Sequence, residues 1–109
     1  MSELKCKDKL SSINNEELRI LLSYVNSEPI FFNEKRLVSI DEINDYKEDL
    51  LIDIECIPLI DLYDNYYIIY DLKENEFQVY DISEDVIVEK NITIKKYIDE
   101  LVTKLDNIM

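Results

Sequence analysis

The stretch from Ile57 to Ile82, IPLIDLYDNYYIIYDLKENEFQVYDI, constrains the fold of this chain more than any other. It contains three runs rich in the β-branched and aromatic residues that suit a pleated surface: Ile57–Tyr63, Tyr66–Leu72 and Phe77–Ile82. Asp64-Asn65 and Lys73–Glu76 separate these runs, and Asn and Asp tolerate the left-handed backbone of tight turns. Because the chain has no glycine, Asn75 is the residue expected to adopt that backbone in the second turn. The stretch predicts three consecutive strands of an antiparallel meander.

Amphipathic helices are predicted on both sides of this stretch. The N-terminal apolar stripe is Leu18, Leu21, Leu22 and Val25, at helical spacing. We expect Asn14 to cap this helix, with Glu17 reaching back as in a capping box. The C-terminal stripe is Ile94, Tyr97, Ile98, Leu101, Val102 and Leu105. It predicts a helix that is capped by Asn91 or Thr93 and ends near Leu105.

Shorter elements are predicted between the helices and the meander. Ile30–Phe32 reads as a short strand, and residues 36–40 as a second strand or an extended connector. Ser39 and Glu42 have the spacing of a capping box before a short acidic helix over residues 41–48. Residues 50–55 fit a half-buried strand or the lead into the meander, and residues 86–89 a fourth, short strand.

These elements predict one α+β domain over residues 1–109, with residues 1–12 as a loose N-terminal segment. The expected architecture is an antiparallel sheet of about four to six strands. An N-terminal helix and a C-terminal amphipathic helix are expected to pack on it. No apolar run approaches the ~20 residues that span a bilayer, and no signal peptide is recognisable, so we expect a cytoplasmic protein without a membrane partner.

The composition argues against an enzyme. The chain has no histidine, so a nucleophile–His–acid triad and a Cys/His metal site are excluded, and no cofactor is expected. Without glycine it cannot form a P-loop or a dinucleotide-binding turn. Its acidic loops lack the D-x-D-x-D-G order of a calcium loop. Cys56 lies in an apolar run and is expected to be a buried small hydrophobe.

The net charge of −13 is concentrated in one part of the chain. Residues 41–90 hold sixteen acidic and three basic residues, whereas the segments before and after them are each neutral overall. A field of this sign repels nucleic-acid phosphates and anionic lipids, and it favours a basic protein partner. The alternative interpretation is that the charge serves solubility alone.

Acidic and tyrosine residues alternate through the same segment. The residues predicted to contact a partner are Asp61, Tyr63, Asp64, Tyr66, Tyr67, Asp71, Tyr80, Asp81, Glu84 and Asp85. Tyrosines are enriched among interface anchors, and surrounding acids would steer a basic partner. In the alternative interpretation about half of the tyrosines belong to the core and the acids form a solvated sheet face.

The order of these elements resembles that of the SUKH superfamily, small α+β proteins related to fungal cell-wall assembly regulators. The residues that carry the resemblance are Ser39–Ile43, Ile57-Pro58-Leu59, Asp64-Asn65-Tyr66, Asp71-Leu72, Phe77–Tyr80 and Ile94–Leu101. The chain departs from the usual pattern in its first helix, which lacks the Leu-Gly and Leu-Pro segment, and at Asn26-Ser27, where Asn-Gly is common.

The resemblance implies a function in binding. Many bacterial members of the superfamily look like immunity proteins that neutralise a cognate toxin, often a nuclease. For this chain the resemblance implies a toxin domain as partner and neither catalytic residues nor a cofactor. Three other hypotheses are an acidic mimic of DNA that inhibits a DNA-binding protein, a regulatory interaction module without a toxin partner, and a small enzyme or ligand binder, which would need a pocket lined by Asp and Tyr.

Overall fold

A computed structural model describes residues 15–49 and 56–108 of the chain. The expectations for residues 1–12 and 50–55 lie outside these residues. The structure confirms the α+β fold: six antiparallel strands form one sheet in the order β1-β2-β3-β4-β5-β6, so every strand pairs with its neighbour in sequence. The strands are β1 (Ile30–Phe32), β2 (Lys35–Leu37), β3 (Cys56–Tyr63), β4 (Tyr66–Asp71), β5 (Glu76–Asp81) and β6 (Val86–Ile92).

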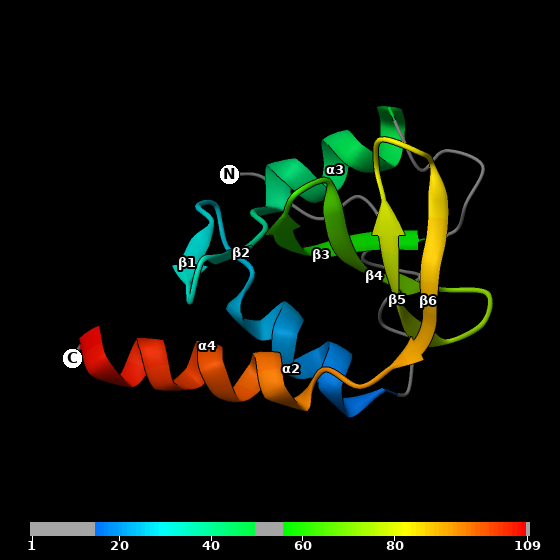
Figure 1. Cartoon of the computed structure of the whole chain (residues 1–109). Coiled ribbons are helices and arrows are strands. Elements are labelled where there is room, and N and C mark those ends of the chain that lie inside the picture. Colours follow the sequence, from blue (N-terminus) through cyan, green and yellow to red (C-terminus); the bar gives the residue numbers. More distant parts are fainter. Residues whose placement is uncertain (1–14, 50–55, 109) are drawn as a thin grey trace.

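Helices cover both faces of the sheet (Figure 1). Helix α3 (Ile40–Asp49) lies on one face and contacts β3. Helices α2 (Glu16–Tyr24) and α4 (Lys95–Ile108) lie together on the other face. The meander is therefore the middle layer of the molecule, and its side chains are sorted between two different helical coverings.

Helices α2 and α4 bury apolar side chains in the same core cluster as the sheet. Leu18 and Leu21 of α2 are fully buried, as are Ile94 and Leu101 at α4. Burying each such side chain contributes about 1.5–3 kcal/mol to folding. On the sheet, the ring of Tyr70 meets that of Phe77 edge to face, with 4.9 Å between ring centroids. The aromatic and aliphatic stripes that the sequence displays thus meet in one cluster.

The meander and its turns confirm the sequence-based prediction. All three strands form, and Asp64, Asn65 and Asn75 have φ of 52°, 73° and 56°, the left-handed backbone expected of glycine substitutes. The Ser39–Glu42 capping box also forms: the Ser39 N–H donates to Glu42 Oε2 at 2.8 Å. In return the Glu42 N–H donates to Ser39 Oγ at 3.2 Å.

Several boundaries differ from the prediction. The cap of α2 is Asn15 rather than Asn14, because it is the Asn15 Oδ1 that accepts from the Leu18 N–H at 3.0 Å. Asn91 caps no helix: it lies in β6, which is longer than expected, and α4 begins only at Lys95. Residues 36–40 divide between β2 and the start of α3. Cys56 is buried at the start of β3, as expected.

Candidate functional site

The β3–β4 and β5–β6 turns lie at the same end of the sheet, because neighbouring strands run in opposite directions. Tyr66, at the start of β4, pairs with Tyr63 on one side and with Asp81 on the other. The Ile82 N–H donates a 2.8 Å hydrogen bond to the Asn65 carbonyl, which joins the two turns. Among the exposed residues gathered here, we call the two tyrosines and three carboxylates the turn-end surface: Tyr63, Asp64, Tyr66, Glu84 and Asp85.

Two tyrosine rings accompany the carboxylates of the turn-end surface. Tyr63 is 42% exposed and Tyr66 38% exposed, and the two are direct cross-strand partners. The side chains of Asp64 and Glu84, on the adjoining turns, are also exposed. Aromatic rings bind cations over their faces, and carboxylates bind them through charge-assisted hydrogen bonds. This arrangement can therefore contact lysine and arginine side chains of another protein.

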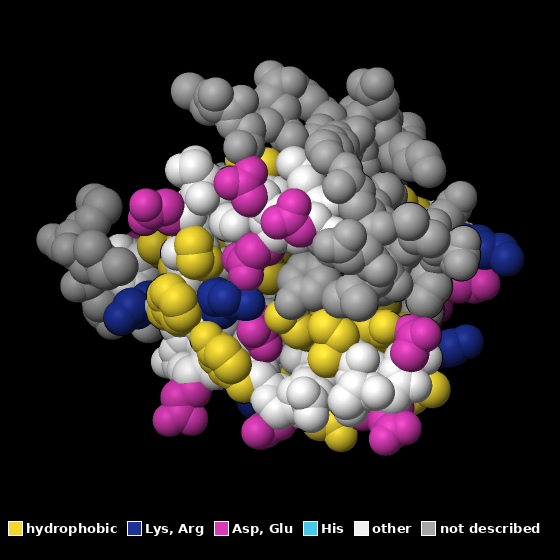
Figure 2. Space-filling model, turned by 90° about the horizontal axis from the view of Figure 1, so that it is seen from above, with side chains coloured by type: hydrophobic (Ala, Val, Ile, Leu, Met, Phe, Trp, Pro, Cys, Tyr) yellow, Lys and Arg dark blue, Asp and Glu magenta, His cyan; other side chains and the backbone are white. Residues whose placement is uncertain are grey.

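Behind the turn-end surface, one row of cross-strand partners runs through all six strands. Its members are Phe31, Arg36, Asp61, Tyr67, Tyr80 and Ile87. Cross-strand partners share a face of the sheet, and the ion pair of Arg36 with Glu42 of α3 shows that this is the face that carries α3. Phe31, at one edge of the row, is 59% exposed, whereas Tyr67 and Tyr80 are buried. Figure 2, seen from the α3 side, shows hydrophobic side chains beside basic ones, with acidic side chains around them.

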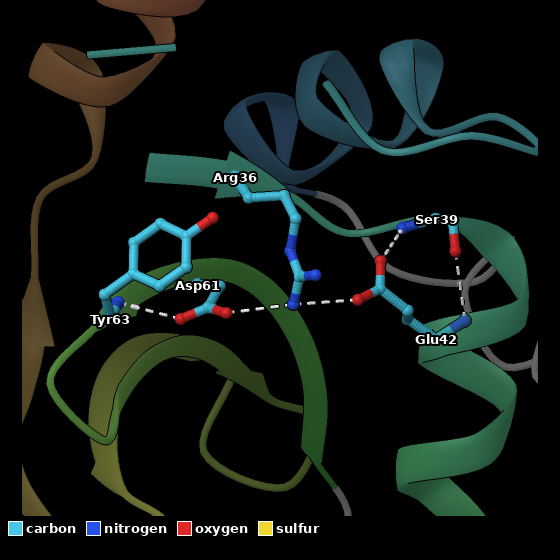
Figure 3. A network of polar contacts seen from close by, with 5 residues as sticks. All are labelled: Arg36, Ser39, Glu42, Asp61 and Tyr63. Carbon is cyan, nitrogen blue, oxygen red and sulfur yellow. Dashed lines mark hydrogen bonds and ion pairs between the residues drawn. The ribbon is translucent and has the colours of Figure 1, made fainter. Parts of the chain in front are cut away.

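Arg36 binds two carboxylates at once, as Figure 3 shows. Its Nη2 lies 2.8 Å from Glu42 Oε1 on α3 and 2.9 Å from Asp61 Oδ2 on β3. Burial alone lowers the pKa of Arg36, but the charges of Glu42 and Asp61 raise it, and the net direction is upward. The guanidinium therefore remains a cation that links the start of α3 to the middle of the sheet.

Asp61 also holds the backbone at Tyr63. The second carboxylate oxygen of Asp61, Oδ1, accepts a 2.8 Å hydrogen bond from the Tyr63 N–H. Tyr63 has φ of 65°, and with Asp64 and Asn65 it forms three consecutive residues of left-handed backbone. This conformation is rare for a bulky side chain and costs of order 1–3 kcal/mol. The exposed Tyr63 ring is thus displayed from a strained backbone that a buried carboxylate supports.

The β5–β6 turn is organised by Asp81. Its Oδ1 accepts from the Ser83 Oγ at 2.8 Å, from the Ser83 N–H at 2.9 Å and from the Glu84 N–H at 3.2 Å. The side-chain hydrogen bond from Ser83 lowers the pKa of Asp81, backbone hydrogen bonds lower it further, and burial opposes them. The Tyr80 hydroxyl donates to Asp85 Oδ1 in the same turn. Asp81 and Tyr80 therefore shape the turn, while Glu84 projects from it.

The β4–β5 turn repeats this geometry at the opposite end of the sheet. There Asp71 Oδ1 accepts from the N–H groups of Lys73 and Glu74, at 2.8 and 3.0 Å. The segments Tyr70–Asn75, YDLKEN, and Tyr80–Asp85, YDISED, correspond residue by residue. Large exposed hydrophobic side chains, by contrast, are absent from this second turn among the described residues.

The structure brings nine of the ten predicted partner-binding residues to one end of the sheet, in different roles. Asp71 is the exception, at the far end in the β4–β5 turn. Asp61, Tyr67, Tyr80 and Asp81 are buried and support the surface from below. Tyr63, Asp64, Tyr66, Glu84 and Asp85 are the exposed members. Tyr67 and Tyr80 therefore belong to the core, as the alternative interpretation of the tyrosines expects. Tyr63 and Tyr66 are exposed, as partner binding requires.

Sequence reasoning missed Phe31 and Arg36. Phe31 was assigned only to a short apolar strand, although alternation within Ile30-Phe31-Phe32 must turn one ring away from the core. No local pattern of the sequence indicates a role for Arg36, because Glu42 lies on α3 and Asp61 lies on β3, far along the chain.

A shallow depression between the β1–β2 turn and α4 is lined by Asn33, Asp99, Glu100, Thr103 and Lys104, none of them a predicted site residue. Within residues 15–49 and 56–108, no group of three or more Cys, Asp or Glu side chains is arranged to hold a metal ion. None of the helices in this part of the chain is long and apolar enough to cross a membrane.

Comparisons with known proteins leave the family a prediction. No protein-family model, no curated protein and no solved structure matches this chain. The resemblance to the SUKH superfamily accordingly depends on the residues quoted in the sequence analysis. The turn-end surface is defined independently of it, by strand pairing and exposure alone.

Proposed function

We propose that this chain is an immunity-type protein that binds and neutralises a cognate bacterial toxin domain in the cytoplasm of the producing cell. The contact is made by the turn-end surface. The observation that carries the proposal is the meeting of Tyr63 and Tyr66 with the exposed carboxylates Asp64 and Glu84 at one end of the sheet. Tyrosine is enriched among interface hot spots, and complementary charges around such anchors steer the partner.

The charge distribution supports a basic partner. The turn-end surface belongs to residues 41–90, which carry the whole excess of negative charge. Such a field accelerates the encounter with a basic protein, and salt weakens the effect. A toxin that cleaves nucleic acid needs a basic cleft for its substrate, and an acidic surface seated there would exclude the substrate. This mechanism requires stoichiometric binding and no chemistry by the bound chain.

The rigid support under the surface favours binding without rearrangement. Asp61 and Asp81 fix the two turns through hydrogen bonds to backbone N–H groups. A surface that is ordered before binding loses less conformational entropy when the complex forms. The predicted partner therefore docks onto a preformed shape.

The test uses the toxin domain encoded by the gene directly upstream of this one, since immunity genes follow their toxins. The purified domain should bind the full chain one to one in calorimetry, with affinity that falls steeply as salt rises. Co-expression should also restore growth to cells that express the toxin domain. A complex whose affinity is insensitive to salt, or the absence of binding to any toxin domain encoded beside it, would contradict the proposal. Capture of a DNA-binding enzyme instead would favour the hypothesis of a DNA mimic. Capture of a cellular partner that is not toxic would favour the hypothesis of a regulatory module.

A further inference from the structure

The polar network in Figure 3 joins α3 to the exposed Tyr63 through two carboxylates and one guanidinium. It begins at Ser39 and Glu42, which cap α3, and passes to Arg36 through the 2.8 Å ion pair with Glu42. It continues from Arg36 to Asp61 at 2.9 Å and ends at the Tyr63 N–H, 2.8 Å from Asp61 Oδ1. Each carboxylate uses one oxygen for Arg36 and the other for a backbone N–H, whereas the Nη2 of Arg36 serves both carboxylates.

We propose that Arg36 is a positioning residue for partner binding: through Asp61 it holds Tyr63 in the left-handed backbone that presents its ring on the turn-end surface. This inference rests on the proposed function for the role of the surface. It adds a determinant, Arg36, that touches no partner and that the sequence did not indicate. Arg36 affects binding of the partner only indirectly, through the orientation of Tyr63.

The argument begins with the burial of Asp61, which is 7% exposed. A buried carboxylate that loses its counter-ion is strongly unfavourable and is expected to move toward water or other donors. Either movement takes Oδ1 out of line with the Tyr63 N–H. Arg36 prevents this, because its permanently charged Nη2 lies 2.9 Å from Asp61 Oδ2 and holds that oxygen on the Arg36 side while Oδ1 faces the Tyr63 N–H.

The second step concerns the strain at Tyr63. A bulky residue at φ of 65° keeps that conformation only where its surroundings over-determine it. The hydrogen bond that the Tyr63 N–H donates to Asp61 Oδ1 is one such restraint, and the tight Asp64-Asn65 turn is another. Without the first, Tyr63 is expected to relax toward ordinary extended backbone, which moves its ring relative to Tyr66.

The network supplies its own matched control. Arg36 makes two ion pairs of nearly equal length, and only the one with Asp61 leads to Tyr63. Glu42→Gln weakens the pair on the α3 side and leaves the Asp61 side in place. Arg36→Met removes the charge from both sides while keeping most of the side-chain volume. The difference between these two variants isolates the positioning role from general loss of an ion pair.

The experiment measures amide hydrogen exchange and backbone chemical shifts of the full chain by NMR. In Arg36→Met, exchange at the Tyr63 amide should accelerate by about fivefold or more, the effect of losing one ordinary hydrogen bond. Shifts at Tyr63, Asp64 and Asn65 should change with it. Glu42→Gln should perturb Ser39 and leave Tyr63 unchanged. If Arg36→Met does not fold, Arg36→Lys replaces it. Its acceleration at Tyr63 should be smaller than that expected for Arg36→Met, but larger than at any other amide of the sheet.

Binding to the purified upstream toxin domain separates the possible failures. Arg36→Met should weaken affinity about fivefold or more, in parallel with Tyr63→Ala, as expected when an interface anchor is displaced. Unchanged Tyr63 signals in a folded Arg36→Met variant, or equal changes in Glu42→Gln, overturn the inference. So does a Tyr63 that moves without any loss of affinity. If the wild-type chain does not bind the toxin domain, the proposed function fails, and the NMR result alone decides whether Arg36 positions Tyr63.

Discussion

Asp71 and Asp81 occupy equivalent places in two turns at opposite ends of the sheet. Each uses Oδ1 to accept hydrogen bonds from the backbone N–H groups two and three residues later. Each turn then continues into a left-handed residue, Asn75 with φ of 56° or Asp85 with φ of 54°. The same solution thus replaces glycine twice, and the two turns differ chiefly in what surrounds them.

This equivalence makes a charge-reversal pair the most direct prediction about the surface. Glu84 and Glu74 hold corresponding, exposed positions, but only Glu84 lies beside Tyr66 and its paired Asp81. Glu84→Lys should weaken binding of the toxin domain about tenfold, whereas Glu74→Lys should change it only slightly. Calorimetry at matched salt provides the measurement. Equal effects of the two substitutions would mean that net charge, rather than the turn-end surface, governs binding.

A second prediction concerns left-handed backbone at Asn75. Asn75→Ala keeps the Cβ where φ is 56° but removes the polar side chain that makes this backbone tolerable for Asn, so it should lower the free energy of unfolding by about 1 kcal/mol. Asn75→Gly, which accepts this backbone without a clash, is the control and should stay closer to wild type. Urea denaturation measures both. An Asn75→Ala variant as stable as the glycine variant would contradict the prediction.

The buried hydroxyl of Tyr80 predicts a loss of stability at high pH. Burial first, then the hydrogen bond with Asp85, raises the pKa of Tyr80 from 10.0 to about 12. The unfolded chain therefore ionises at Tyr80 before the folded one does. The stabilisation is complete below about pH 10 and is lost as pH rises toward 12, by at most about 3 kcal/mol.

Tyr80→Phe checks this assignment. The variant lacks the ionising group, so its unfolding free energy should fall less between pH 10 and 12 than that of wild type. It should also be less stable at neutral pH by about 1–3 kcal/mol, because the bond to a carboxylate is gone. Tyr66→Phe, at an exposed site, is the comparison. A Tyr80→Phe variant with an unchanged alkaline profile would refute the role of Tyr80.

Asp81 predicts the opposite dependence at low pH. Its pKa is lowered, chiefly by the Ser83 side-chain hydrogen bond, so the folded state favours the ionised carboxylate. The resulting stabilisation is present above the unfolded pKa of Asp81 and is lost as pH falls through the folded value. Ser83→Ala should bring the Asp81 pKa nearer to its ordinary value, which carbon-detected NMR titration can measure. An unchanged Asp81 titration would show that the backbone N–H groups dominate.

The cap of α2 tests how finely sequence resolves a helix boundary. Asn15→Ala removes the acceptor of the Leu18 N–H and should lower stability by about 1 kcal/mol. Asn14→Ala, the substitution that the sequence pattern alone would make costly, is the comparison. Thermal unfolding distinguishes the two, and a larger loss for Asn14→Ala would contradict the cap at Asn15.

The local patterns of the chain predicted its elements well where each pattern is self-contained. Alternation and turn residues located β3, β4 and β5, and helical spacing located α2 and α4. The Ser39–Glu42 box was recognisable because both partners lie within one turn of helix. Two boundaries failed for different reasons: Asn14 and Asn15 are chemically identical neighbours, whereas Asn91 resembles a cap but its strand continues past it.

By itself, then, the sequence determined the sheet-forming segments, the flanking helices, the glycine-free turns and the location of the excess charge, since all of these depend on neighbours in the chain. Only the tertiary structure decided which tyrosines are exposed and which carboxylates are occupied. Tyr63 and Tyr67 belong to the same acidic, aromatic run, yet one is exposed and the other buried. Tyr63 is exposed at the end of its strand, whereas Tyr67 lies on the face of the sheet that α3 covers. The same packing of α3 brings Arg36 to Glu42 and Asp61. These contacts depend on how whole elements pack, which no local pattern records.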